Sequence, residues 1–95
     1  MQFIWTEKFK DNNPKETIKN IRNYFLKFDY KIIEEDNFYV KQSNTYWCSI
    51  GLYKNNNKVL HSNGKGSSEL MSLASGYGEL FERYVSLFEI ASNPF

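Results

Sequence analysis

Two glutamates on one helical face form the most chemically suggestive pattern in the sequence. Glu79 and Glu82 are three residues apart, so in a helix their carboxylates are neighbours about 4.5 Å apart along the axis. A hard divalent cation such as Mg²⁺ would relieve their repulsion, because such ions bind carboxylate oxygens and share them with phosphates and water. Arg83, four residues after Glu79, could neutralise that carboxylate instead.

Small residues surround this acidic pair, among them Ser75, Gly76 and Gly78. Each glycine inside a helix costs about 1 kcal/mol relative to alanine, so two within three positions suggest that another group approaches the backbone closely. From spacing alone, a solvated helical face with an ordinary Glu79–Arg83 ion pair is the better interpretation, because such pairs are common.

A glycine-containing segment, Asn63-Gly64-Lys65-Gly66-Ser67, precedes this helix. A strand followed by a glycine loop and a helix N-terminus can direct backbone N–H groups at an anion. The segment is not a P-loop, because glycine rather than Ser or Thr follows Lys65. It also lacks the third glycine of the dinucleotide-binding fingerprint, whose place Glu69 occupies.

The long helix predicted over residues 67–91 positions these groups, and it has two faces at about 100° per residue. Its apolar face comprises Leu70, Leu73, Ala74, Tyr77, Leu80, Phe81, Tyr84, Leu87 and Phe88. Its polar face comprises Ser68, Ser72, Ser75, Glu79, Glu82, Ser86 and Glu89, with Arg83 at the border.

An earlier helix is predicted over residues 14–28, after an extended lead-in over residues 1–13. Asn13 is a good N-cap, and proline suits the first helical position that follows it. Lys10 lies just before this helix and Thr17 in its first turns. A lysine and a hydroxyl at the donor-rich end of a helix could hold a phosphate, but from these residues alone an ordinary lysine beside an ordinary helix start is the better interpretation.

Strands are predicted within residues 31–62. Two short strands flank Asp36-Asn37, and residues 46–53 form the best strand, in which Cys48 alternates onto a packed face. A turn over residues 54–58 leads to a second hairpin arm that carries His61, which we interpret as structural. We therefore expect an α+β fold, with two helices packed on a small, mostly antiparallel sheet.

Composition restricts the function further. The chain has 95 residues, is 41% hydrophobic and 18% aromatic, and has a net charge of +1. These values predict one small globular domain, with no general attraction to nucleic acid or acidic membranes. The single cysteine excludes an intramolecular disulfide, and without a signal peptide or an apolar run of about 18 residues we expect a cytoplasmic, non-membrane protein.

The order Gly64-Lys65-Gly66, then Ser75, Glu79, Glu82 and Arg83, resembles the N-terminal signature of the YcaO family. Gly76 replaces the alanine that usually follows the serine. The upstream Lys10-Asp11 and Thr17-Ile18 steps also resemble the members that assist methylthiolation of a ribosomal protein, with Thr17 in place of a serine.

The resemblance implies binding of ATP with Mg²⁺ at a site that is not a P-loop. Many YcaO proteins phosphorylate a peptide amide oxygen there, so that azolines or thioamides can form. Glu79 and Glu82 would then hold Mg²⁺, Ser75 would lie beside the nucleotide, and Arg83 would support the carboxylates or phosphates. Lys10 and Thr17 would add nucleotide contacts.

The resemblance covers only the first part of a YcaO domain, which runs to several hundred residues. We therefore expect this chain to be inactive alone, as a truncated gene product, an expressed piece or one half of a split protein. Its partners would be a peptide or protein substrate, the remainder of a split YcaO domain, or a second copy in a homodimer. The alternatives are a small non-catalytic module that binds a protein or peptide, for which the aromatic content argues, and a degenerate relic.

Overall fold

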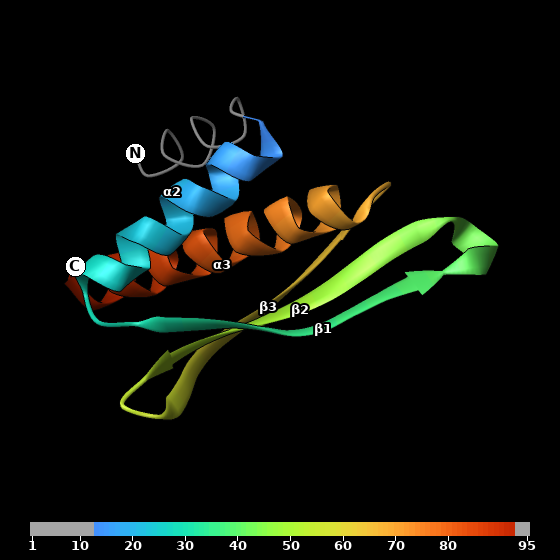
Figure 1. Ribbon diagram of the computed structural model, residues 1–95. Coiled ribbons are helices and arrows are strands. Elements are labelled where there is room, and N and C mark those ends of the chain that lie inside the picture. Colours follow the sequence, from blue (N-terminus) through green and yellow to red (C-terminus); the bar gives the residue numbers. More distant parts are fainter. Residues whose placement is uncertain (1–12, 93–95) are drawn as a thin grey trace.

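The described chain forms an α+β fold with two helices and a three-stranded antiparallel sheet (Figure 1). The computed structural model describes the backbone of residues 13–92 and the side chains of residues 13–87, so the lead-in over residues 1–13 lies almost wholly outside it. The elements are, in order, α2 (Pro14–Lys27), β1 (Lys31–Val40), the short 3-10 helix η1 (Lys41–Ser43), β2 (Thr45–Lys54), β3 (Asn57–Gly66) and α3 (Glu69–Ser92). The strands pair in the order β1-β2-β3. This is the predicted fold class.

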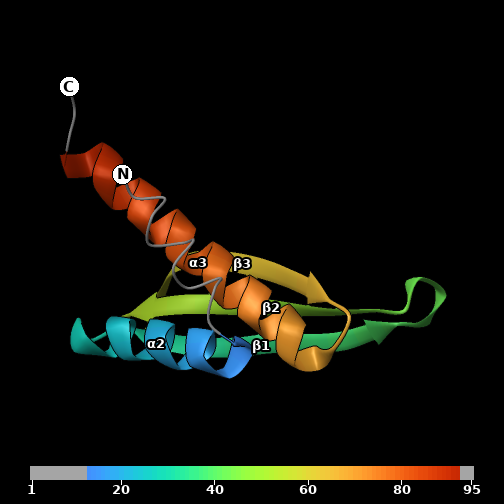
Figure 2. The ribbon, with the colours of Figure 1, turned by 90° about the horizontal axis from the view of Figure 1, so that it is seen from above.

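Both helices lie on one side of the sheet (Figure 1). Helix α3 crosses β3 and β2 at an angle, and its C-terminal half runs beyond the strands (Figure 2). Helix α2 packs beside α3 and leaves the other side of the sheet uncovered by any described residue. The sheet therefore has a packed face and an open face.

Helix α2 begins as its sequence predicts. The side chain of Asn13 accepts a hydrogen bond of 2.9 Å from the backbone nitrogen of Glu16, and this satisfies one of the N–H groups that a helix start leaves unpaired. The helix ends at Lys27, one residue before the predicted end, because Asp29 adopts a left-handed conformation with a φ of 64°.

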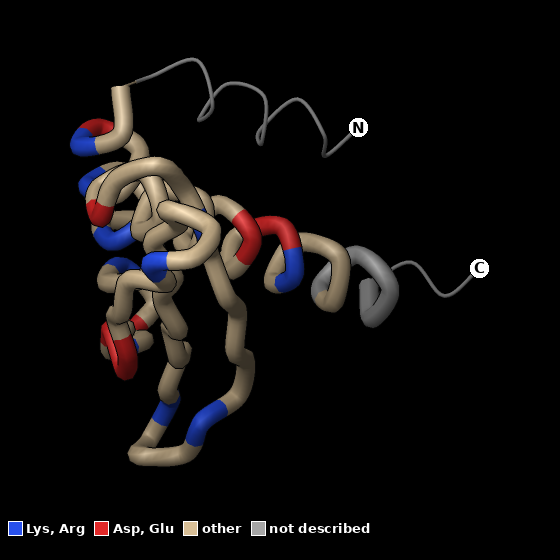
Figure 3. Tube along the Cα trace, turned by 90° about the vertical axis from the view of Figure 1, so that its right-hand side faces the viewer, with Lys and Arg blue, Asp and Glu red and all other residues tan. Residues whose placement is uncertain are grey.

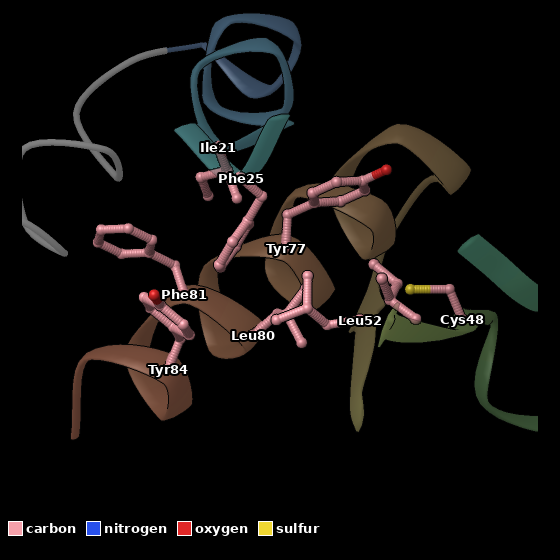
Figure 4. Packing of buried hydrophobic residues seen from close by; sticks show 9 residues of the cluster. Ile21, Phe25, Cys48, Leu52, Tyr77, Leu80, Phe81 and Tyr84 are labelled. Atoms are coloured by element: carbon pink, nitrogen blue, oxygen red, sulfur yellow. The ribbon is translucent and has the colours of Figure 1, made fainter. Parts of the chain in front are cut away.

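The core lies between the two helices and the packed face of the sheet. Ile21 and Phe25 from α2 meet side chains from α3 and β2 there (Figure 4). The ring of Phe25 contacts that of Tyr84 edge to face, with 5.0 Å between centroids, a geometry that aromatic pairs prefer. The whole cluster of buried hydrophobic residues is Ile21, Phe25, Cys48, Ile50, Leu52, Tyr77, Leu80, Phe81 and Tyr84.

Three glycines let α3 approach the sheet closely. A Cβ atom on Gly64 would overlap the carbonyl oxygen of Ser72 and the backbone nitrogen of Gly76. One on Gly66 would lie 2.8 Å from Ser72 N, and one on Gly76 would lie 2.9 Å from Cys48 Sγ. The prediction of a glycine loop was wrong, because Gly64 and Gly66 belong to β3 and serve packing.

Hydrogen bonds fasten α3 to the sheet at this close approach. The hydroxyl of Ser62 donates to the carbonyl oxygen of Gly76 at 2.8 Å, and the thiol of Cys48 donates to that of Ser72 at 3.2 Å. Ser72 is fully buried, so its predicted place on the solvated face was wrong. Leu87 needs the opposite correction: it was predicted to lie on the apolar, packed face of the helix, but it is 55% exposed.

Two predictions within the strands also need correction. Residues 31–40 form one continuous strand rather than two, because a register shift between Glu34 and Asp36 absorbs the polar residues in the manner of a β-bulge. The turn between β2 and β3 contains only Asn55 and Asn56, with φ angles of 53° and 67°. Asparagine tolerates this conformation, which suits a tight hairpin.

Candidate functional site

The predicted acidic pair lies on the outward surface of α3. Acidic positions neighbour a basic one on the stretch of this helix that runs toward the C-terminus (Figure 3). The guanidinium of Arg83 donates to Oε2 of Glu79 from Nε at 3.1 Å and from Nη2 at 2.7 Å. Glu82 is exposed and makes no hydrogen bond or ion pair with another described side chain. Glu79 is therefore partly neutralised within the helix, whereas Glu82 is not.

The two helical glycines differ in what approaches them. Gly76 contacts the sheet through Ile50 and Cys48, so its close neighbour belongs to the fold. Gly78 has no heavy atom within 4 Å of the position that a Cβ would occupy. Ser75 is exposed on the same helix. The surface of α3 beside Ser75 and Gly78 is thus open, and nothing in the described fold explains the second glycine.

The upstream residues of the predicted site are placed differently. Thr17 is buried on α2, with 6% of its surface exposed, and its backbone nitrogen donates to the carbonyl oxygen of Asn13 at 3.0 Å. Lys10 lies outside the described residues. The structure thus gathers Ser75, Glu79, Glu82 and Arg83 on one helix and holds Thr17 in the interior. Nucleotide contacts by Lys10 and Thr17 stay predictions.

A complete protein-derived metal site is absent from residues 13–87, where no group of three or more His, Cys, Asp or Glu side chains is arranged to hold an ion. Glu79 and Glu82 offer only carboxylate oxygens, which is the donor type that Mg²⁺ prefers. Magnesium usually takes one or two carboxylates and completes its octahedron with substrate phosphates and water. The pair therefore fits a shared magnesium site better than a closed one.

A phosphate-binding loop would place Lys65 beside the start of α3, but Lys65 does not lie there. Its ammonium lies 5.3 Å from the ring centroid of Trp47, on the open face of the sheet. Trp47 stacks in parallel with Phe38 across the strands, with 6.5 Å between centroids. Lys65 thus belongs to an exposed aromatic patch, made of Phe38, Trp47 and Lys65, that the sequence did not identify as one unit.

Sequence reasoning also missed a polar network that joins three elements. The hydroxyl of Tyr77 donates to Oε2 of Glu34 at 2.7 Å and accepts a hydrogen bond from the guanidinium of Arg22. Burial raises the pKa of Tyr77, and the hydrogen bond to Glu34 raises it further, so the phenol stays protonated and acts as a donor. The partners are 43 and 55 residues from Tyr77 in the chain, so no local pattern could reveal them.

Glu35 and Cys48 are among the other described groups whose pKa values are perturbed. Hydrogen bonds from Tyr53 and then Lys58 hold the pKa of Glu35 below its ordinary value. Burial raises the pKa of the Cys48 thiol, which disfavours the reactive thiolate. Cys48 is thus a packing residue, as predicted.

No protein-family model, curated protein or solved structure matches this chain. None of the helices in the described range is both long enough and apolar enough to cross a membrane.

Proposed function

We propose that this chain is the N-terminal, ATP- and magnesium-binding portion of a YcaO-type protein. The complete domain would activate peptide amides by ATP-dependent phosphorylation, or would assist methylthiolation of a ribosomal protein. One observation carries the proposal. Four polar residues of the YcaO signature, Ser75, Glu79, Glu82 and Arg83, stand on the outward side of α3, and none of them belongs to the buried core.

The residues of α3 have separable roles in this proposal. Glu79 would exchange its ion pair with Arg83 for magnesium, and Glu82 would supply the second carboxylate. The guanidinium released in this exchange would then be available to phosphate oxygens, which it can bind through two parallel hydrogen bonds. Magnesium would neutralise the phosphate charge.

The open space beside Gly78 supports the same proposal. An interior glycine costs a helix about 1 kcal/mol relative to alanine, and no described neighbour requires one at this position. A ligand seated against the backbone between Ser75 and Glu82 would require it.

Titration with ATP in the presence and absence of Mg²⁺ tests the proposed function. Because the described residues supply only part of a metal site, we expect weak binding, with a dissociation constant on the order of 1 mM. The amide resonances of residues 75–83 should shift saturably with ATP and Mg²⁺, and much less with ATP alone. No magnesium-dependent shift of these resonances would contradict the proposal.

A second function, a module that binds a protein or peptide without nucleotide, is favoured by the aromatic patch of Phe38, Trp47 and Lys65. Phe38 is 48% exposed, and exposed aromatic side chains are enriched at protein interfaces. Absence of ATP binding in the titration above would favour this second function.

A further inference from the structure

A groove between α2 and the start of α3 combines an apolar floor with a basic rim. It has a volume of about 390 Å³, and its apolar residues are Ile18, Leu26 and Leu70. Leu26, near the C-terminal end of α2, is 63% exposed. The surface of α2 thus presents an apolar strip that the described chain leaves open.

The rim of the groove has a single sign of charge. Lys15, Lys19 and Arg22 line it, and none of its lining residues is acidic. Arg22 lies 3.7 Å from Glu34, so its charge is partly compensated. Lys15 and Lys19 form no ion pair with any side chain among residues 13–87. The two lysines are one helical turn apart, so their ammonium groups lie along the same edge.

We propose that this groove binds an acidic amphipathic helix of a partner protein. Apolar side chains of the partner would cover Ile18, Leu26 and Leu70, and its carboxylates would pair with Lys15 and Lys19. Charge complementarity selects this partner, because a basic or neutral helix would leave the lysines unpaired at a desolvated rim.

The spacing of the apolar floor favours a helix as the occupant. Ile18 and Leu26 are eight residues apart, which places them about 12 Å apart along α2. A partner helix can match that distance with side chains two turns apart, as in other helix-in-groove complexes. A second copy of this chain is a poor occupant of the groove. Its α2 would place Lys15, Lys19 and Arg22 against the same three basic residues of the first copy.

This inference goes beyond the nucleotide proposal, because it uses α2 and the first turn of α3 rather than the acidic surface of α3. Loss of ATP binding would leave the groove unaffected. Conversely, substitutions in the groove should leave the magnesium-dependent shifts of residues 75–83 unchanged.

Fluorescence anisotropy with a labelled synthetic peptide tests the inference. The probe is a helix of about 14 residues, or about four turns, with leucines every three or four positions and glutamates beside them. We expect saturable binding that weakens as salt is added, because exposed charges are screened. A second peptide, with lysine in place of every glutamate, should not bind.

Variants of the groove complete the test. Lys15→Glu with Lys19→Glu should weaken binding at least tenfold, and Leu26→Ser should weaken it severalfold, without unfolding the chain, because all three side chains are exposed. The matched control, Lys31→Glu with Lys41→Glu, makes the same charge change on β1 and η1 and should have little effect. Absence of acidic-peptide binding, equal weakening by the control, or self-association of the chain through the groove would overturn the inference.

Discussion

Replacing Gly64 by valine should lower the free energy of unfolding by more than about 3 kcal/mol, the upper end of what overpacking usually costs. Any Cβ at this position overlaps the backbone of Ser72 and Gly76. The backbone of a helix cannot move locally to relieve this overlap, as a flexible side chain can, so the whole of α3 must shift. That shift also breaks the hydrogen bonds that Ser62 and Cys48 donate to the backbone carbonyl oxygens of Gly76 and Ser72. Urea unfolding followed by circular dichroism measures the effect.

Gly78→Ala is the matched control for this prediction. It also adds a Cβ to a glycine, but into open space, so it should stabilise the chain by about 1 kcal/mol through helix propensity alone. A Gly64→Val chain as stable as the wild type would show that β3 and α3 are not packed as described.

The double substitution Glu79→Gln with Glu82→Gln should weaken magnesium-dependent ATP binding at least tenfold. Glutamine keeps the size of the side chain but removes the charge that a hard cation needs. The fold should persist, because the only described contact that is lost is the exposed Glu79–Arg83 pair, and such a helical pair contributes about 0.3–0.5 kcal/mol.

Glu16→Gln with Glu69→Gln provides the control, since it removes the same two charges elsewhere. Glu16 is exposed at the start of α2, and Glu69 accepts a hydrogen bond from Asn37 that glutamine can also accept. Equal loss of ATP binding in the two double variants would show a general charge effect and would contradict the assignment of Glu79 and Glu82.

Much of the fold could be predicted because its signals are local. The capping of α2 by Asn13, the alternation that buries Cys48, Ile50 and Leu52 in β2, and most of the apolar face of α3 each depend on residues close in the chain. Hydrophobic periodicity of this kind is the main secondary-structure signal in a sequence.

The glycines of β3 could not be predicted in the same way. Gly64 and Gly66 carry no side chain, so they show no alternation of apolar and polar residues that would indicate a strand. Beside Ser67 and Ser68, they were therefore predicted to form a loop. Their role depends on a helix that packs across them. Ser72 was misplaced for the same reason, because a small polar residue is buried only where the sheet comes close.

The residues of the candidate site could likewise be predicted only where their signal is local. The shared surface of Ser75, Glu79, Glu82 and Arg83 follows from helical spacing and could be predicted. The burial of Thr17 depends on how α2 packs, and the attachment of Lys65 to Trp47 depends on strand register. Neither the burial of Thr17 nor the contact of Lys65 with Trp47 could be predicted from residues close in the chain.

Paramagnetic relaxation by Mn²⁺ tests most directly whether the outward surface of α3 holds a metal-bound nucleotide. Mn²⁺ takes the oxygen ligands that Mg²⁺ prefers, and it broadens the resonances of nearby nuclei. With ATP present, substoichiometric Mn²⁺ should selectively broaden the amide resonances of residues 75–83, and Glu79→Gln with Glu82→Gln should abolish the effect. Broadening spread evenly over the chain, or centred on another element, would contradict the account.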